Sequence, residues 1–511
     1  MKDSFGRRDF LKTLAATAFG LSGARASYGS GLFSNKSAKS TKPNIIFLLA
    51  DDQRWDTMGC YGNKHIITPN MDKLAADGVL FENVYHASPI CQPSRASIMT
   101  GRYLTSHRCG FDRPTTFAIS KAEFAESYPV GLRKAGYRTC FVGKFGFPVT
   151  DEKVLGIEFP YPNGKRNYRT GLWLKTEHMP SGEFDRWNGY AGQGKYDTDK
   201  GHLTEVNANY ACQFIADTKK SQADKPFCLS VSFKAPHGPF QPMSKYRKLY
   251  DDKDIPRYSN DGVDYFNKLP KVVREQYRGR KGVGEFSNFI KNYYALITGV
   301  DAALGQIRDE LKKQGLEENT VIIYSSDNGF FCGSKRLRGK DLLYEESVRA
   351  PLLYYDPRAK ALKGGSKIAG LVSIVDFAPT ILELGGVSRP SSMHGVSFLG
   401  LVNGSKTKVR KSTFSENNFA SFRTAVEDAK DDAEREEIFK KGTVRSKCVR
   451  TEQYKYIRYH ETKPLIEELW DIQKDPLELH NLVNDSSHAT VLALMRQKCD
   501  EYIRIGESER N

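Results

Sequence analysis

Polar side chains able to bind a metal or exchange a proton follow four apolar segments of the chain. In chain order they are Asp51 and Asp52, Lys144, His237, and the pair Asp327 and Asn328. Taken singly, an aspartate pair or an Asp-Asn-Gly sequence is typical of a cap or turn, and a lone histidine is often structural. Taken together, three carboxylates and an amide oxygen are hard ligands, which suit Ca²⁺ or Mg²⁺ better than Zn²⁺. The pattern predicts a divalent-cation site with His237 beside it as an acid or base.

A further reactive position is Cys91, in the stretch PICQPSRASIMTG over residues 89–101. On local grounds this thiol could be half of a disulfide, a metal ligand, a nucleophile with His86 or His107 as its base, or the precursor of another group. The Pro-Ser step that follows favours a helix start, where free N–H groups attract an anion, and Arg95 adds a fixed charge. Because a soft thiolate is a poor match for a hard cation, this site favours an oxygen nucleophile.

The elements that carry these residues must bring them together. The four apolar segments are nearly continuous in hydrophobic residues, as are strands buried on both faces of a parallel sheet. Helical patterns fall between them, for example over 68–78 and 292–315. Ligands of open parallel sheets bind outside the carboxyl ends of the strands. We therefore expect an α/β sheet covered by helices, with one convergent site at that edge.

The two ends of the chain differ from its middle in residue composition and pattern. Residues 1–26 combine paired arginines, a short apolar run and a small-residue end, which resembles a twin-arginine export signal. Residues 27–42 are rich in Ser, Gly and Lys, as flexible linkers are. Residues 43–404 form the expected catalytic domain, and 405–511 a small α+β domain. The latter includes a charged helical pattern over 427–442.

The location expected from this layout is outside the cytoplasm, periplasmic or secreted. No later segment contains the roughly 18 consecutive apolar residues of a membrane span, so we do not expect an integral membrane protein. The chain has 77 basic and 61 acidic residues and a net charge of +16, which favours an acidic partner. No nucleic-acid module accompanies this charge, so an acidic polysaccharide is favoured over nucleic acid. The nine cysteines contain no C-x-x-C pair, which argues against a zinc ribbon or thioredoxin motif.

The stretch CQPSRASIMTG resembles the signature C-x-P-S-R-x-x-x-x-T-G of the type I, formylglycine-dependent sulfatases. Further motifs of that family resemble, in the same order, KPNIIFLLADDQRWD, SSDNGF, RGKDLLYEESVRAPLL and LWDIQKDPLELHNL. The resemblance covers most of residues 43–485. It implies the alkaline phosphatase-like fold: a large mixed, mostly parallel sheet sandwiched by helices, and a smaller C-terminal α+β domain with an antiparallel sheet.

The resemblance also implies a chemistry. In that family a maturation enzyme oxidises the cysteine to formylglycine, whose hydrate attacks the sulfur of a sulfate ester and then expels sulfate by collapsing to the aldehyde. By the same resemblance, one Ca²⁺ per chain is bound by Asp51, Asp52, Asp327, Asn328 and the modified Cys91. The roles implied for the remaining residues are stabilisation of the hydrate by Arg95, binding of sulfate oxygens by Lys144 and Lys340, and sulfate contact with protonation of the leaving alcohol by His237.

The chain departs from the family at one position. Many members have a histidine two residues after the lysine that corresponds to Lys144, whereas this chain has Gly146. The collapse step then needs another base or a water, and His86 and His107 are candidates.

The expected substrate is a sulfated carbohydrate. The stretches GKFG, PICQPSRASI and PFCLSVSFKAPH most resemble bacterial sulfatases acting on N-acetylglucosamine 6-sulfate in glycans. One alternative is a phosphate or phosphonate ester hydrolase of the same fold. The other is a non-catalytic polyanion-binding protein, which would keep the basic cleft without the metal ligands.

Overall fold

The computed structural model describes residues 42–508 apart from several short runs. These runs are 111–117, 152–158, 161–165, 168–175, 222–223, 278–284, 360–362, 420–432 and 434–443. The expected signal over 1–26 lies outside the described residues. So do the expected linker, except Lys42, and nearly all of the charged segment 427–442.

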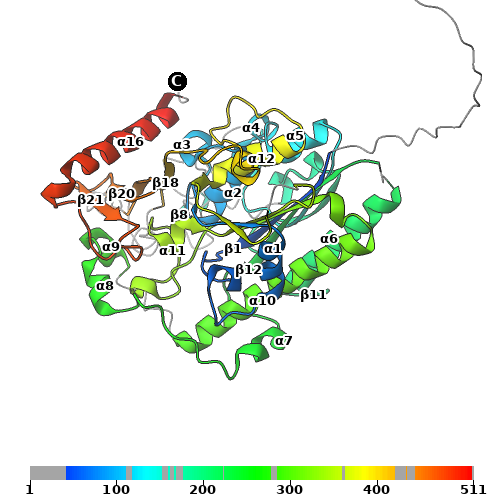
Figure 1. The fold of residues 1–511 in the computed structure, drawn as a ribbon, viewed down its shortest axis with the longest axis horizontal. Coiled ribbons are helices and arrows are strands. Elements are labelled where there is room, and N and C mark those ends of the chain that lie inside the picture. Colours follow the sequence, from blue (N-terminus) through cyan, green and yellow to red (C-terminus); the bar gives the residue numbers. More distant parts are fainter. Residues whose placement is uncertain are drawn as a thin grey trace, which may run out of the picture. The chain divides into compact units, whose positions relative to one another are not determined.

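An eight-stranded sheet carries the site (Figure 1). In spatial order its strands are β16 (Ser366–Ile368), β2 (Val79–Phe81), β15 (Leu352–Tyr355), β13 (Thr320–Ser326), β1 (Asn44–Asp51), β12 (Phe227–Pro236), β5 (Arg138–Lys144) and β9 (Arg186–Tyr190). The strands from β13 to β9 run parallel, whereas β15 is antiparallel to both β13 and β2. The sheet is therefore mixed and mostly parallel, as expected.

The register of the central strands aligns the ends that carry the polar residues. β1 lies between β13 and β12, with Ala50 opposite Ser326 and Asp51 opposite Pro236. β5 pairs with β12 on its other side. Every residue of β1 is buried, which accounts for its uninterrupted apolar sequence. The carboxyl ends of these four strands consequently meet at one edge.

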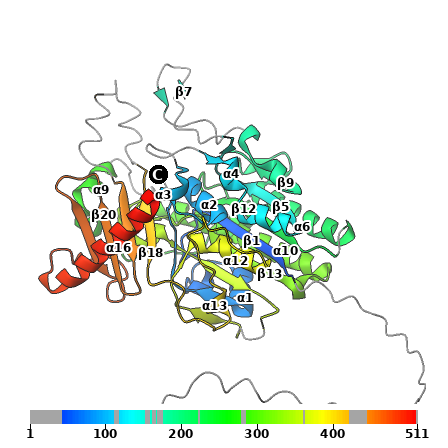
Figure 2. The same cartoon turned by 90° about the horizontal axis from the view of Figure 1, so that it is seen from above.

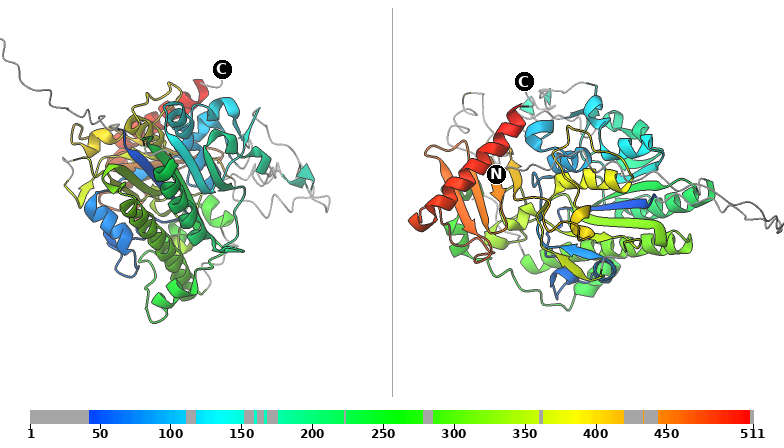
Figure 3. Two further views of the ribbon diagram at one scale, coloured as in Figure 1. Left: turned by 90° about the vertical axis from the view of Figure 1, so that its right-hand side faces the viewer. Right: turned by 45° about the horizontal axis from the view of Figure 1, so that its top comes forward.

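Helices cover both faces of this sheet, and the side chains of β1 alternate between two cores. Ile46 and Leu48 pack in a core with α6 (Leu203–Ser221) and α10 (Phe286–Lys313), two long helices that lie side by side (Figure 3). Phe47 packs on the other face, in the core that includes residues of α2, α5 and α12. The bounds of these last three helices are Cys91–Thr100, Tyr128–Lys134 and Phe377–Leu384. In the described part of the chain, no helix has the length and apolarity required to cross a bilayer.

One expected helix differs in extent from the structure, and the segment before it contains short helices. The helix expected over 292–315 begins six residues earlier, because Phe286 and Phe289 extend its buried apolar stripe. The segment 240–290, irregular in composition, contains the short helices α7 (Ser244–Arg247), α8 (Val263–Lys268) and α9 (Lys271–Gln276).

The C-terminal part forms the expected antiparallel sheet. Its strands, in order, are β18 (Thr413–Asn417), β19 (Ser446–Arg450), β20 (Tyr454–Tyr459) and β21 (Ile466–Asp471). The long helix α16 (Ala489–Ser508) packs across β19 and β20 (Figure 2). Phe414, Tyr456 and Leu469 belong to the same buried cluster as Phe47 of the main sheet, so the two sheets share a core.

All nine cysteines lie within the described residues, and none is paired in a disulfide. Cys140 and Cys228 are buried inside β5 and β12, as expected for small apolar residues in strands.

Candidate active site

Cys91 lies at the centre of the convergent strand ends. Helix α2 begins at Cys91 itself, two residues before the expected start at Pro93, and the preceding Ile90 is extended. The Cys91 Sγ lies 3.4 Å from Asp51 Oδ1 and 2.6 Å from Lys340 Nζ. Three segments distant in sequence thus meet at one sulfur atom, which is almost fully buried.

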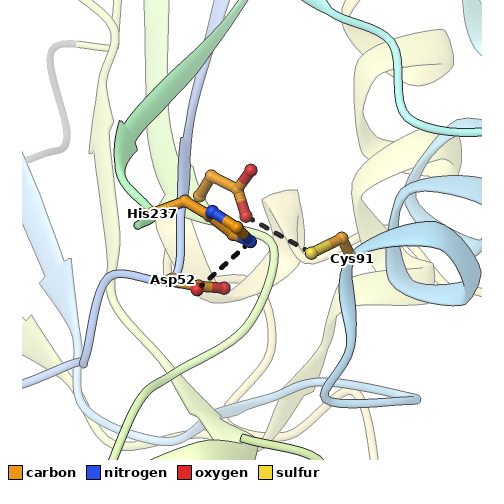
Figure 4. Close-up of side chains that lie close together, drawn as sticks. Asp52, Cys91 and His237 are labelled. Carbon is orange, nitrogen blue, oxygen red and sulfur yellow. Dashed lines mark hydrogen bonds and ion pairs between the residues drawn. The ribbon is translucent and has the colours of Figure 1, made fainter. Parts of the chain in front are cut away.

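Ligand atoms gather beside this sulfur (Figure 4). One ligand atom each from Asp51, Asp52, Cys91 and His237 lie within 4.8 Å of one another. The four residues come from the end of β1, the start of α2 and the loop after β12. This grouping has the size of a single coordination sphere.

Asp327 and Asn328 join this group through Asp52. The backbone N–H of Asp52 donates to Asp327 Oδ1 at 3.1 Å, and Asn328 Nδ2 donates to Asp52 Oδ1 at 2.7 Å. The buried Oδ1 of Asn328 has no hydrogen-bond partner among the described residues. A buried carbonyl oxygen without a donor, next to three carboxylates, fits a hard divalent cation as its missing partner.

Cations surround the carboxylates. The ion pairs are Lys144 with Asp51, Lys340 with Asp52, and Arg95 with Asp327. Burial would raise the pKa of Asp51, but the charges of Lys144, His237 and Arg95 outweigh it and hold that pKa well below its usual value. Asp327 behaves oppositely: burial and the neighbouring Asp51 raise its pKa to about 6, with Arg95 offsetting only part. The neighbouring cations therefore stabilise the charged form of Asp51, whereas the charged form of Asp327 is stabilised less than burial and Asp51 destabilise it.

The Cys91 thiol is a poor nucleophile in this setting. Burial and the negative charge of Asp51 raise its pKa to about 12. At neutral pH the group is almost entirely a thiol rather than a thiolate, and only the thiolate attacks efficiently. A simple cysteine hydrolase is therefore disfavoured.

The departure at Gly146 has a structural reason. Arg95 Nη1 donates to Lys144 O at 2.6 Å and to Ser232 Oγ at 2.5 Å, and these bonds run the side chain past residue 146. Gly146 has φ +92°, and a Cβ built there would lie 2.4 Å from Arg95 Cδ. A histidine at this position would have to displace the arginine that pairs with Asp327.

His237 is oriented by its own loop. Its Nδ1 lies 2.7 Å from Gly238 O and carries the hydrogen there, because a carbonyl oxygen only accepts. Its Nε2 faces Asp52 Oδ2 at 3.8 Å (Figure 4). Burial lowers the pKa of His237, although Asp52 opposes the shift, so the neutral ring prevails at pH 7.

The two histidines considered as replacements for the missing one lie outside the ligand group. His107 accepts from the N–H of Cys109 at 3.0 Å and contacts Ser97 Oγ at 2.9 Å, so its ring is engaged in the helix packing. His86 is buried with neither ring nitrogen hydrogen-bonded among the described residues, and burial with the nearby Lys340 lowers its pKa to about 3.

Three residues near the site were not anticipated from the sequence. Gln193 Oε1 accepts from Lys144 Nζ at 2.7 Å, Ser232 accepts from Arg95, and Lys234 Nζ donates to Gly238 O at 3.1 Å behind His237. Lys234 and Ser232 stand in SVSFKAPH, where their closeness to His237 is a usable signal. Gln193 comes from a loop between β9 and α6 that has no such signal.

Two family models match this chain. The model described as "Sulfatase" matches residues 43–387. The model described as "N-sulphoglucosamine sulphohydrolase, C-terminal" matches residues 333–504. Together they cover both sheets and all the site residues named above.

Individual proteins are similar over nearly the whole length. An "N-acetylglucosamine-6-O-sulfatase" of Bacteroides thetaiotaomicron is 27% identical, with 91% of this chain and 86% of that protein covered. An "Arylsulfatase" of Clostridium perfringens is also 27% identical, over 89% and 93%. A solved structure in complex with its substrate, D-glucosamine-2-N,6-O-disulfate, superposes with a TM-score of 0.69 at 25% identity, over 91% and 98% of the two chains. A phosphonate monoester hydrolase of Agrobacterium radiobacter, at 22% identity and a TM-score of 0.68, shares the fold.

Proposed function

Because this chain belongs to the sulfatase family and is a sulfuric ester hydrolase, we propose that it removes sulfate from a carbohydrate through a formylglycine made from Cys91. The observation that carries the proposal is the position of Cys91 Sγ, held between Asp51 and Lys340 at the end of the central strands. When formed, the hydrated aldehyde supplies an oxygen nucleophile and a second hydroxyl whose proton loss releases sulfate.

Sulfated glycans are the substrate class that the relatives support, and the finer proposal is 6-O-sulfated N-acetylglucosamine or a related saccharide. One similar protein is named for that sugar and position, and a solved relative binds a glucosamine with a sulfate at the same position. An "Ulvan-active sulfatase" of Formosa agariphila, 28% identical over 90% of this chain, extends the class to algal polysaccharide.

The chain's own cations would hold the sulfate. Lys340 Nζ, 2.6 Å from Cys91 Sγ, reaches any group bound at that atom, and Lys144 pairs with Asp51, which also contacts that sulfur. Both ammonium groups balance the negative charge that builds on the sulfate oxygens. Arg95 orients the site through Asp327. His237 Nε2 faces Asp52, and once that nitrogen has taken up a proton the ring would donate it to the leaving alcohol.

Residues Asp51, Asp52, Asp327 and Asn328 would hold a divalent cation, for which we propose Ca²⁺, one per chain. When bound, it would supply positive charge that stabilises the attacking oxygen. The all-oxygen protein donors favour a hard cation, and the unpartnered Oδ1 of Asn328 is an open ligand position.

We further propose that the protein is exported, with residues 1–26 as its signal, and that a formylglycine maturation enzyme acts on it. Its similar proteins include one named "Extracellular sulfatase SULF-1 homolog", 28% identical over 74% of this chain. Fractionation of the producing cell, with mass determination of the mature N-terminus, tests the first part.

The central experiment pairs product analysis with analysis of residue 91. The protein is produced with a maturation enzyme, and sulfate release from N-acetylglucosamine 6-sulfate is compared with phosphate release from the 6-phosphate. We expect sulfate release only. The residue-91 peptide should have a lower mass than the cysteine form, since oxygen replaces sulfur and two hydrogens are lost. The proposal would be overturned if phosphate were released faster than sulfate. It would also be overturned if protein whose residue 91 is still cysteine were fully active.

The cation is tested on the same preparation. Treatment with EDTA should abolish sulfate release, and Ca²⁺ should restore it more fully than Mg²⁺. Restoration by Mg²⁺ alone would contradict the choice of Ca²⁺ while leaving the reaction unaffected.

A further inference from the structure

We propose that Arg338 forms a second anion subsite beside the sulfate site, so that the preferred substrate is a saccharide with two acidic groups. The inference rests on the proposed function and adds a requirement on the substrate: a carboxylate or a second sulfate near the ester that is cleaved.

Arg338 is an exposed cation without a protein counter-ion. Among the described residues, its guanidinium forms no ion pair and no hydrogen bond, and it lies over two aromatic rings. Other cations of the same segment are paired: Lys335 with Glu346, and Lys340 with Asp52. The guanidinium of Arg338 is therefore available to an external anion.

The aromatic contacts hold this cation in place. The Arg338 guanidinium lies 5.9 Å from the ring centres of both Phe240 and Phe289, within the range of a cation–π contact. The two rings meet edge to face at 4.9 Å, and each packs against Phe330. These three phenylalanines form what is here called the aromatic seat of Arg338. An arginine already held on such a surface loses less conformational freedom when it binds an anion, and its planar guanidinium suits the paired oxygens of a carboxylate or sulfate.

The seat is built from segments that also carry site residues. Arg338 stands two positions before Lys340, so their Cα atoms are at most about 7 Å apart. Phe240 follows His237 by three positions, and Phe330 follows Asn328 by two. The backbone around Arg338 is held in place on both sides. Leu337 is buried, and the N–H of Phe331 donates to Gly339 O at 2.8 Å. A saccharide whose sulfate contacts Lys340 would extend past the Arg338 side chain.

Arg336 provides a matched control. It is also an exposed arginine of this loop, two positions earlier, and its side chain has no ring contact with any residue that the structure describes. A general effect of positive charge would be lost equally with either arginine, whereas a built subsite depends on Arg338 alone.

The test compares singly and doubly charged substrates. Initial rates are measured on N-acetylglucosamine 6-sulfate and on two saccharides in which that unit carries a second sulfate or is linked to a uronate. We expect Arg338→Ala to raise KM and lower kcat/KM roughly tenfold on a doubly charged substrate, and to leave the singly charged one unchanged. Arg336→Ala should change neither. The two doubly charged saccharides distinguish sulfate from carboxylate as the second anion.

Binding is measured separately, so that the inference does not depend on turnover. The affinity of Cys91→Ser protein for each saccharide is measured by calorimetric titration. Adding Arg338→Ala should weaken binding of the doubly charged saccharides only, and Arg338→Lys should restore part of that affinity. Equal losses for both arginine variants, or no preference of the parent protein for a second charge, would overturn the subsite. Absence of sulfate release by mature wild-type protein, with the binding preference intact, would count against the proposed function only.

Discussion

Two clusters of buried charged side chains share the segment that contains Lys335 and Lys340, and they differ in how their charges are paired. The first is the proposed reaction centre around Cys91, called the reaction centre below. The second, here called the interface network, consists of Lys335, Glu345, Glu346, Lys455 and Glu478. The network joins β20 and the loop after β21 to the segment that contains Lys340.

In the interface network, every charged group lies beside a group of opposite charge. Lys335 Nζ lies 2.8 Å from Glu346 Oε1, and Lys455 Nζ lies 2.6 Å from Glu478 Oε1 and 3.1 Å from Glu345 Oε1. The backbone N–H of Glu345 also donates to Glu478 Oε2 at 3.0 Å. All five side chains are at most 7% exposed, so no ligand reaches them.

The reaction centre is open on one side. His237 is 23% exposed and Lys340 14% exposed, and the Oδ1 of Asn328 has no hydrogen-bond partner among the described residues. The charged groups of the interface network are thus paired with one another. The reaction centre instead retains sites at which a cation and an anionic substrate could bind. Variants in the first cluster should change turnover, and variants in the second should change stability.

The largest effect is expected from Cys91→Ala. Because it removes the thiol from which the proposed formylglycine is made, sulfate release should fall by about 10⁴-fold or more. The melting temperature should stay close to that of the parent protein. Cys228→Ala, at a buried cysteine of β12, is the control and should retain activity. Retained activity in Cys91→Ala would end the formylglycine proposal.

Breaking the interface network should show the opposite pattern. Lys455→Met leaves the buried Glu345 and Glu478 without the lysine that pairs with both, and should lower the free energy of unfolding by about 4 kcal/mol. Urea denaturation measures this, with Glu452→Gln, in an exposed pair with Lys408, as the control. The folded fraction should still release sulfate. An unchanged free energy of unfolding would show that this ion pairing does not stabilise the fold.

Lys340→Ala tests the boundary between the clusters, since the residue sits in the segment held by the network but points into the reaction centre. Loss of its charge should lower kcat/KM about a hundredfold, through both kcat and KM. Lys367→Ala, an exposed lysine of β16, should have no effect. A change in stability without a change in kinetics would assign Lys340 to the network instead.

The smallest effect concerns pH. Burial raises the pKa of Glu468 from 4.5 to about 7, although hydrogen bonds from Tyr459 and Tyr344 lower it in part. The folded state thus holds a proton that the unfolded state releases, so this group's stabilisation is present at pH 4.5 and lost as the pH rises through 7. Glu468→Gln should reduce the fall in stability between pH 5 and 8 by about 2 kcal/mol. Denaturation curves at several pH values measure it, and an unaltered pH dependence would place the titration elsewhere.

Much of the site could be predicted from the sequence because its residues follow strands. Continuous apolar runs predicted β1, β5, β12 and β13, and the rule for parallel sheets placed Asp51, Lys144, His237 and Asp327 at one edge. Residues from irregular segments were not predictable in this way. Gln193 reaches Lys144 from a loop with no periodic pattern, and the network pairs Lys335 with Glu478, far apart in sequence.

The sequence alone determined the residue types, the order of strands and helices, and the signature around Cys91, because these depend on neighbours within a few positions. The tertiary structure decided which distant groups meet. Lys340 reaches Cys91 across 249 positions, and Gly146 leaves the space that the Arg95 side chain occupies. Such contacts depend on strand register and on the space that packed side chains leave, and neither is encoded in any local pattern.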